Sequence, residues 1–214
     1  MKFLFTGAFG FLGNNVRPFL ERMYDVTTIG LLPQDDYTVN IAKEIPDLDE
    51  RYDIVLHAAG KAHSVPRTEA EKQVFFDVNL QGTKNLCTAL ERRGVPRAFI
   101  FISTVAVYGC AYGENITEDH PLNGDTPYAM SKRLAEEYLQ KWCYEHNVIL
   151  GIIRPSLITG PNPPGNLGGY DSWYPQWKIS QYCWRSGTKE CVDGAGYCKV
   201  GSSVGRKGRH LQCM

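Results

Sequence analysis

The sequence has no excess of either charge, because 23 Lys and Arg residues balance 23 Asp and Glu residues over 214 positions. A nucleic-acid-binding surface usually leaves a basic excess, so the composition gives no support to a nucleic-acid partner. Long apolar runs are lacking as well. The opening run from Lys2 to Thr6 is far too short for a membrane span or a signal peptide, and no later stretch reaches the length that a bilayer demands. We therefore expect a cytoplasmic protein with no membrane partner.

The seven cysteines lack the patterns that would give them a structural role. Their number is odd and no two of them have the CxxC spacing, which argues against a disulfide framework and against a zinc site. Cys183, Cys191, Cys198 and Cys213 are too widely and irregularly spaced for metal ligands. We expect reduced thiols and no metal.

The chain opens with a pattern typical of a phosphate-binding turn, MKFLFTGAFGFLG from Met1 to Gly13. An apolar strand leads into Gly7, Gly10 and Gly13 and then into a helical pattern. Gly7 would permit a tight turn, Gly10 would let the backbone approach a pyrophosphate, and Gly13 would let the helix pack closely on the strand. The alternative is a purely structural turn.

Apolar strands alternate with amphipathic helices along the next 140 residues. This alternation predicts right-handed crossovers and an α/β fold with a Rossmann-type doubly wound parallel sheet. The expected helices are 11–24, with Pro18 as a kink or irregularity, 69–93 and 128–146. The expected strands after the first are 26–29, 38–41, 53–57, 99–102 and 148–153.

The end of the second expected strand bears on the choice of dinucleotide. Sites of this type often place an acid there to hold the ribose hydroxyls, but Thr28, Ile29 and Gly30 stand in its place. Asp35 and Asp36 follow this strand, and either would replace the missing acid as the partner of the ribose hydroxyls. No Arg or Lys lies between Gly30 and Tyr37 to meet a 2′-phosphate, which favours NAD over NADP.

Six segments, in order, resemble the extended short-chain dehydrogenase/reductases, in particular the NAD-dependent epimerase/dehydratase family that acts on nucleotide sugars. They are TGAFGFLG at 6–13, HAAG at 57–60, VNLQGTKNL at 78–86, FISTVAVYG at 101–109, YAMSK at 128–132 and IRPSLITGP at 153–161. The resemblance covers roughly the first 168 residues. It implies an enzyme that binds NAD and a nucleotide sugar, and a homodimer is compatible with it.

The resemblance implies that Thr104, Tyr128 and Lys132 are catalytic. Tyr128 would remove a proton from a sugar hydroxyl while hydride passes to the nicotinamide, and Lys132 would also hold the nicotinamide ribose. Tyr128 and Lys132 share one face of a helix, and an ammonium together with an oxidised nicotinamide would favour the phenolate. Thr104 would bind the reacting hydroxyl, with its neighbour Ser103 less favoured. An ordinary surface pair on a helix is the alternative for Tyr128 and Lys132.

The resemblance also assigns other positions to cofactor binding and to substrate binding. Asn40 and Ile41 would enclose adenine, Asn79 would order the helix beside the lysine, and Asn166 and Thr104 would contact substrate. Lys61 departs from the small residue usual at its position and would meet either a phosphate or water. The full set implied for the cofactor is Gly7, Phe9, Gly10, Phe11, Leu12, Gly13, Asn40, Ile41, His57, Ala58, Ala59, Gly60, Asn79, Ser103, Tyr128, Lys132, Pro155 and Leu157.

The chain changes character after Gly168. Residues 169–214 hold three of the four tryptophans, four of the seven cysteines and a single leucine, and they show neither helical nor strand periodicity. We expect an NAD-binding domain at 1–168 and an aberrant tail at 169–214 in place of the substrate lobe, which is therefore incomplete or truncated.

A frameshift would explain the tail. Read from the second base of each codon, Glu190 to Met214 permits SVLMAQDIAKLVPLLAEKGGIYNV, which has leucines at helical spacing and a strand-like end, as in the family. A divergent genuine tail is the alternative. Sequence leaves open two classes besides the enzyme: a non-catalytic NAD-binding module, because the substrate lobe is missing, and a structural or regulatory relative that binds no dinucleotide.

Overall fold

The computed structural model describes residues 1–62, 64–110, 116–156, 158 and 160, and the backbone of 182–185, 188–191 and 211–213. Its centre is a parallel sheet in the order β3-β2-β1-β4-β5-β6-β9. The strands are β1 (Lys2–Thr6), β2 (Asp25–Gly30), β3 (Tyr37–Thr38), β4 (Ile54–His57), β5 (Ala98–Ile102), β6 (Ile149–Ile153) and β9 (Leu211–Cys213). β1 pairs with both β2 and β4, so the chain reverses its direction of travel across the sheet at β1. Ligands of open α/β sheets bind at this kind of switch point.

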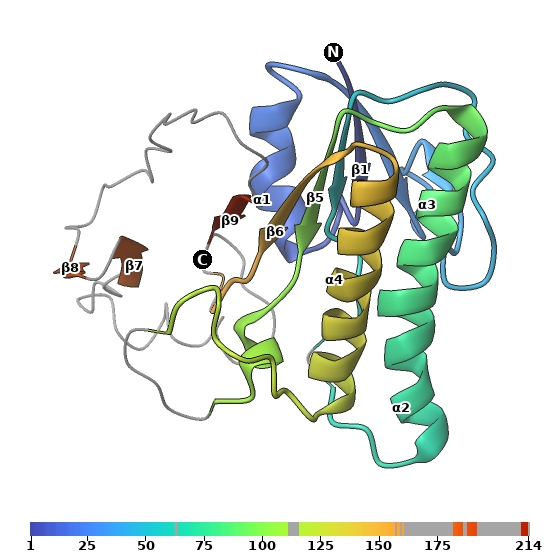
Figure 1. Cartoon of the computed structure of the whole chain (residues 1–214). Coiled ribbons are helices and arrows are strands. Elements are labelled where there is room, and N and C mark those ends of the chain that lie inside the picture. Colours follow the sequence, from blue (N-terminus) through green and yellow to red (C-terminus); the bar gives the residue numbers. More distant parts are fainter. Residues whose placement is uncertain are drawn as a thin grey trace, which may run out of the picture.

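Helices lie on both faces of the sheet (Figure 1). α1 (Phe11–Leu20) covers one face, and α2 (Glu69–Phe76), α3 (Gly82–Arg93) and α4 (Pro127–Glu145) cover the other. A π-helical segment, Asp77–Gln81, joins α2 to α3, and a 3-10 helix, Val105–Tyr108, follows β5. The predicted fold class, a Rossmann-type doubly wound parallel sheet, is confirmed.

The alternation of apolar side chains along β1 explains how the sheet is buried. Leu4 belongs to the core cluster beneath α3 and α4, whereas Phe3 and Phe5 belong to a second cluster on the face of α1. Successive side chains of a strand point to opposite faces, so an unbroken apolar run such as this one is buried on both sides.

Three expected boundaries are wrong. The first helix ends at Leu20 rather than Tyr24, with Pro18 inside it. The expected strand 38–41 is only Tyr37–Thr38, because the Asn40 side chain accepts a hydrogen bond from the Ala42 amide and turns the chain. The expected helix 69–93 is interrupted by the π-helical segment. The other predicted helix and strands are correct to within a residue.

The tail, whose sequence shows no strand periodicity, contains three short strands. β7 (Tyr182–Arg185) and β8 (Thr188–Cys191) form an antiparallel pair, and β9 runs parallel to β6. A Ser-Gly pair separates β7 from β8 in the sequence, and such a pair between short segments is a hairpin signal that periodicity alone does not detect.

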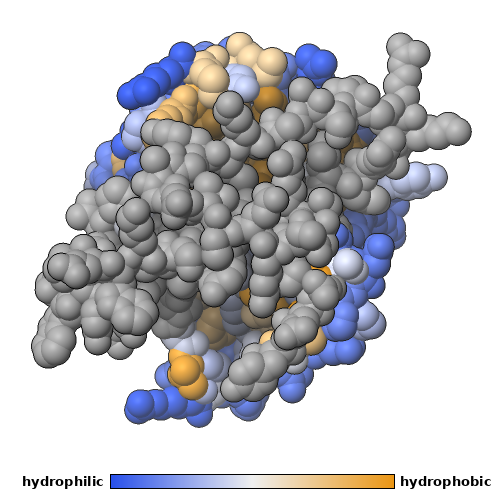
Figure 2. Space-filling model, turned by 90° about the vertical axis from the view of Figure 1, so that its left-hand side faces the viewer, coloured by the Kyte–Doolittle hydropathy of each residue, from blue (hydrophilic) through white to orange (hydrophobic). Residues whose placement is uncertain are grey.

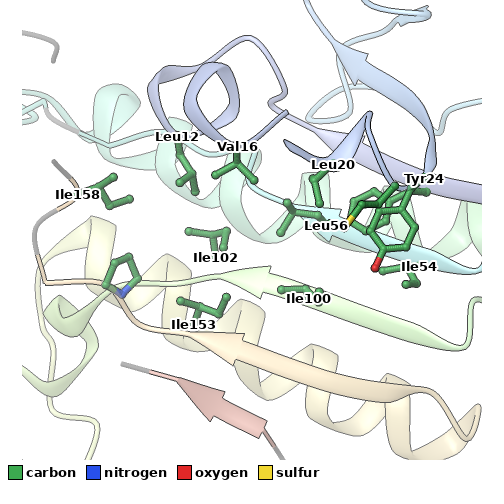
Figure 3. A pocket seen from close by; sticks show the side chains of 13 residues that line it. Leu12, Val16, Leu20, Tyr24, Ile54, Leu56, Ile100, Ile102, Ile153 and Ile158 are labelled. Atoms are coloured by element: carbon green, nitrogen blue, oxygen red, sulfur yellow. The ribbon is translucent and has the colours of Figure 1, made fainter. Parts of the chain in front are cut away.

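An apolar cavity of about 410 Å³ lies between α1 and the sheet. Leu12, Val16 and Leu20 point from α1 toward Ile100 and Ile102 of β5 (Figure 3). Hydrophobic surface is also visible on the side of the molecule that faces left in Figure 1 (Figure 2). The lining has only one polar side-chain group, the Tyr24 phenol, so the cavity is poorly suited to acid–base chemistry.

Membrane-spanning helices and metal-binding clusters are absent from the described part of the chain. No helix there is long and apolar enough to cross a membrane. Within the same ranges no cluster of His, Cys, Asp or Glu could hold a metal ion. Cys87, Cys110 and Cys143 are free thiols.

Candidate functional site

Two glycines of the opening turn are required by the fold itself. Gly7 has φ +76°, and a Cβ there would lie 2.7 Å from the backbone nitrogen of Ala59. At Gly13 a Cβ would lie 2.4 Å from the backbone of Ala8. Gly7 therefore makes the turn and Gly13 lets α1 approach the strand closely, as the sequence predicted.

Gly10 has no comparable structural need. Its φ is −74°, and a Cβ there would meet only one neighbouring atom, the Gly7 carbonyl oxygen at 3.3 Å. Gly10 is also the N-cap of α1 and offers no side chain to the first turn, which leaves the amides of Phe11, Leu12 and Gly13 available to a ligand. A helix N-terminus with free amides and no side chain in front is suited to a phosphate.

An acid lies at the carboxyl end of β2 although the last residues of the strand, Thr28 to Gly30, include none. A Cβ on Gly30 would lie 2.3 Å from Asp35 Oδ2, so the glycine makes room for this carboxylate. Asp35 Oδ2 accepts from the Leu32 amide at 3.0 Å, while its Oδ1 is buried without a partner. Asp36 Oδ2 accepts from both the amide and the hydroxyl of Thr28. Of the two acids that follow β2, Asp35 is the buried one, and one of its oxygens has no partner among the described residues.

The side chain of His57, at the end of β4, is fully buried and both ring nitrogens are occupied. Nδ1 lies 2.6 Å from Thr6 Oγ1 and Nε2 lies 2.9 Å from Thr83 Oγ1. Thr83 donates its proton to the Asn79 carbonyl, so it accepts from His57 Nε2–H, and Thr6 donates to Nδ1. Burial, together with the charge of Lys132, lowers the His57 pKa to about 3. The ring is neutral, and it has no polar atom left for a dinucleotide.

Small residues after His57 fit the glycine turn. The Ala58 amide donates to the Thr6 carbonyl and the Ala59 amide to Thr6 Oγ1. A Cβ on Gly60 would lie 3.0 Å from Lys132 Nζ. Because these residues are small, the turn after β4 packs closely against both Gly7 and Lys132.

Asn79, in the π-helical segment, connects this turn to α4. Its Nδ2 donates to the Lys61 carbonyl and to Ser131 Oγ, and its Oδ1 accepts from the Lys61 amide. Ser131 in turn donates to the Tyr128 carbonyl. The amide is wholly buried and orders the helix beside the lysine, the place that the sequence analysis assigned to it.

Tyr128 and Thr104 are brought together from α4 and from the end of β5. A hydrogen bond from Thr104 lowers the pKa of Tyr128, but burial, the larger effect, raises it, and the net shift is upward. The predicted lowering by Lys132 is not among the causes. Thr104 Oγ1 also accepts from the Ala106 amide, which caps the 3-10 helix.

Lys132 is 4% exposed and its Nζ donates to the Ile102 carbonyl at 2.8 Å. Burial lowers its pKa to about 8, against an opposing contribution from Glu136. The ammonium also lies 4.6 Å from the centre of the Phe101 ring. A lysine this deeply buried is not the ordinary surface member of an i,i+4 pair.

Of the other residues that the sequence assigned to the site, two pack in the core, one is bound through its backbone and two lie outside the described residues. Ile41 is 7% exposed and belongs to the core, and the Pro155 carbonyl accepts from the Val105 amide. Phe9 packs on the core cluster beneath α1. Leu157 and Asn166 lie outside the described residues.

Sequence reasoning missed the partners of the predicted residues. Ser103 donates to Glu136 rather than facing a ligand, and Glu136 is paired with Arg154. Glu136 is one helical turn beyond Lys132, and this i,i+4 spacing was the sequence signal that the two side chains are neighbours. Thr6 and Thr83, the partners of His57, carried no signal, because their pairing depends on the tertiary fold.

The sheet, the glycine turn at its switch point and the polar residues at its carboxyl edge define a dinucleotide-binding type of fold. Residues 3–177 match the family described as the NAD dependent epimerase/dehydratase family. This match covers more than half of the chain, and the chain belongs to that family.

Curated relatives include sugar-modifying enzymes of several kinds. The UDP-glucose 4-epimerase of Vibrio cholerae is 31% identical over 184 residues, which are 77% of this chain and 54% of the relative. The dTDP-D-glucose 4,6-dehydratase of Homo sapiens is 31% identical over 149 residues, which are 69% of this chain and 39% of the relative. The N-acetyl-alpha-D-glucosaminyl-diphospho-ditrans,octacis-undecaprenol 4-epimerase of Escherichia coli O157:H7 is 40% identical over 116 residues, 53% of this chain and 33% of the relative. The chain thus spans about a third to a half of these relatives.

Solved structures with the same fold hold either dinucleotide. RMD from Pseudomonas aeruginosa, complexed with NADPH, has a TM-score of 0.65 at 27% identity, covering 78% of this chain and 57% of that one. The UDP-glucose 4-epimerase of Thermus thermophilus, in complex with NAD, has a TM-score of 0.60 at 26% identity, covering 72% of this chain and 54% of that one.

Proposed function

We propose that this chain binds NAD in the glycine turn at Gly7 to Gly13, and that Thr104, Tyr128 and Lys132 form the catalytic set of a nucleotide-sugar epimerase or dehydratase. The observation that carries the proposal is the burial of Lys132 against Gly60, on the same helix face as Tyr128. Thr104 interacts with the Tyr128 phenol and lowers its pKa.

The residues present fit a dinucleotide. The open space in front of Gly10, the uncapped amides of α1 and the spare oxygen of Asp35 lie along the carboxyl edge of β1 and β2. The carboxylate of Asp35 favours NAD, since a 2′-phosphate at the end of β2 would be repelled by it. Comparing the dissociation constants of NAD and NADP tests this preference, and equal or tighter NADP binding would contradict it.

The side chains can move a proton at one defined atom, Tyr128 Oη. A bound nicotinamide would accept a hydride from the sugar carbon. Tyr128 as the phenolate would take the proton of the sugar hydroxyl, and Thr104 would donate a hydrogen bond to the oxygen from which that proton leaves. Burial opposes the phenolate, so the base depends on positive charge nearby, which Lys132 and an oxidised cofactor would supply.

The substrate class rests on the relatives, several of which are named for nucleotide-sugar reactions. A panel of UDP-, GDP- and dTDP-sugars, incubated with the NAD-loaded protein and analysed for epimerised or dehydrated product, tests it. A product that disappears in Tyr128→Phe would support the assignment. The absence of turnover with every member of the panel would contradict the enzymatic part.

A non-catalytic NAD-binding module is the second candidate, and the observation that favours it is the burial of Tyr128, which raises its pKa and opposes the phenolate. Such a protein would bind NADH with the affinity expected of the glycine turn and would turn over no nucleotide sugar. Fluorescence titration with NADH, run beside the panel of nucleotide sugars, separates the two candidates.

A further inference from the structure

A buried polar cluster lies behind the candidate catalytic residues. Its members are Ser103, Glu136 and Arg154, each no more than 3% exposed. Glu136 and Arg154 form a two-pronged ion pair, with Nη2 to Oε2 at 2.6 Å and Nε to Oε1 at 3.0 Å. Ser103 donates a short hydrogen bond to Glu136 Oε1.

Arg154 has further partners on the other side of its guanidinium. Nη1 donates to the Tyr108 hydroxyl at 2.9 Å and to the Glu118 carbonyl at 3.2 Å. Burial lowers the pKa of Arg154, but its hydrogen bonds to Glu136 and Tyr108 raise it, and the net shift is upward. The arginine is therefore charged.

Stability alone does not account for such a pair. Replacing a buried ion pair by well-packed apolar side chains is often neutral or stabilising, because two charges lose their hydration when they are buried. A buried ion pair is therefore no sign of added stability, and its role is sought in the elements that it joins.

The elements that the cluster joins indicate this role. Glu136 is on α4, one turn beyond Lys132. Ser103 is the first residue after β5 and directly precedes Thr104. Arg154 is the first residue after β6 and directly precedes Pro155. All three elements meet at the carboxyl edge of the sheet, where the Ser103 amide also donates to the Ile153 carbonyl.

We propose that Glu136, held by Arg154, is a positioning residue for the candidate catalytic set: it fixes α4 to the ends of β5 and β6 and places a buried negative charge next to Lys132. The inference rests on the proposed function for its catalytic meaning. What it claims about the Lys132 amino group, that Glu136 favours its charged form, can be measured without turnover.

The titratable groups that interact with Lys132 come from two elements: His57 of β4, which is neutral, and Glu136 of α4. Burial opposes the ammonium of Lys132 and Glu136 favours it.

The experiment is a titration of the Lys132 amino group by NMR, with the side-chain nitrogen of lysine labelled and the signal assigned by its loss in Lys132→Met. The variants are Glu136→Gln and the neutral pair Glu136→Gln with Arg154→Gln. The neutral pair is included because Glu136→Gln alone leaves Arg154 as a buried charge without a carboxylate partner, which is strongly destabilising and can prevent folding. Glu137→Gln is the matched control, since Glu137 is the next residue of α4 and its side chain is 57% exposed.

We expect Glu136→Gln to lower the midpoint of Lys132 by at least about one pH unit, and the neutral pair to lower it by about half a unit or more, because a buried carboxylate beside an ammonium favours the charged form. Glu137→Gln should leave the midpoint within about 0.2 unit of the parent value, since exposed charges interact weakly. A folded neutral pair with the parent midpoint would overturn the inference and reduce the cluster to a structural role. A shifted midpoint in a protein that turns over no nucleotide sugar would support the inference and count against the proposed function alone.

Discussion

Individual residues of the glycine turn show how a repeated residue type can serve different purposes. Gly7 and Gly13 are required by backbone geometry, whereas Gly10 has room for a side chain in the described structure. The motif in the sequence predicted all three roles. Geometry now separates the glycine that only a ligand would require from the two that the fold requires. The same reasoning distinguishes Asp35, which is buried with one unpartnered oxygen, from the exposed Asp36, whose Oδ2 binds Thr28.

Tyr128→Phe removes only the ionisable oxygen of the proposed base. We expect cofactor binding to persist while turnover falls by about 10²–10⁴-fold or more, the usual contribution of a general base. Steady-state kinetics with the best substrate of the nucleotide-sugar panel measure the loss, and NADH titration provides the control. Turnover within a few-fold of the parent would exclude Tyr128 as the base.

Lys132→Met tests the burial of the ammonium through stability. The folded-state pKa of about 8 lies below the ordinary lysine value of 10.5, so the unfolded chain binds more protons between these limits. The stability of the parent should therefore rise, relative to the variant, by roughly 3 kcal/mol as the pH increases from about 8 to 10.5. Urea unfolding of both proteins across this range measures the difference. Parallel pH profiles would show that Lys132 is solvated.

At the scale of elements, the strongly patterned segments were predictable and their interruptions were not. The helix over 69–93 has a regular apolar face, yet the structure inserts a π-helical segment at Asp77–Gln81. Asn79 lies within this segment, and its side chain bonds to Lys61 and Ser131, partners 18 and 52 residues away. No local pattern encodes such contacts. The same is true of the Glu136–Arg154 pair, which joins a helix to a strand end.

The turn after β4 has a pH dependence of its own, because neutral His57 joins β1 to α3 through Thr6 and Thr83. The folded-state pKa of His57 is about 3, below the ordinary histidine value of 6.5, so stability is fully present above pH 6.5 and is lost as the pH falls toward 3. Between pH 7 and pH 5 the parent should lose about 2 kcal/mol more than His57→Gln, whose amide can accept from one threonine and donate to the other. Chemical unfolding at the two pH values checks this. An equal loss in both proteins would mean that the ring is accessible to protons.

At the scale of the whole molecule, the motifs of the family run through the described core and the relatives extend well beyond it. The first 160 residues were predictable because each element has its own periodicity and each motif its own place at the sheet edge. Residues 169–214 have no such pattern, and the three strands found there were not expected.

The frameshift hypothesis predicts a property of the gene. The coding strand after the codon of Gly168, read in its second frame, should encode the leucine-rich segment with Asp-Ile-Ala at its start and Ile-Tyr-Asn-Val at its end. Sequencing the gene decides the matter. A second frame that encodes no such segment would establish a genuine divergent tail.

The central claim is that the glycine turn binds a dinucleotide, and calorimetric titration of NAD into the parent and into Gly10→Val tests it most directly. A branched side chain at Gly10 fills the space in which a pyrophosphate would lie, while the backbone there, at φ −74°, accepts it. We predict that NAD binds to the parent and that its affinity for the variant falls by about 100-fold or more, which corresponds to at least about 2.7 kcal/mol. Thermal unfolding should show that the variant remains folded. Equal affinity of the two folded proteins for NAD would contradict the account.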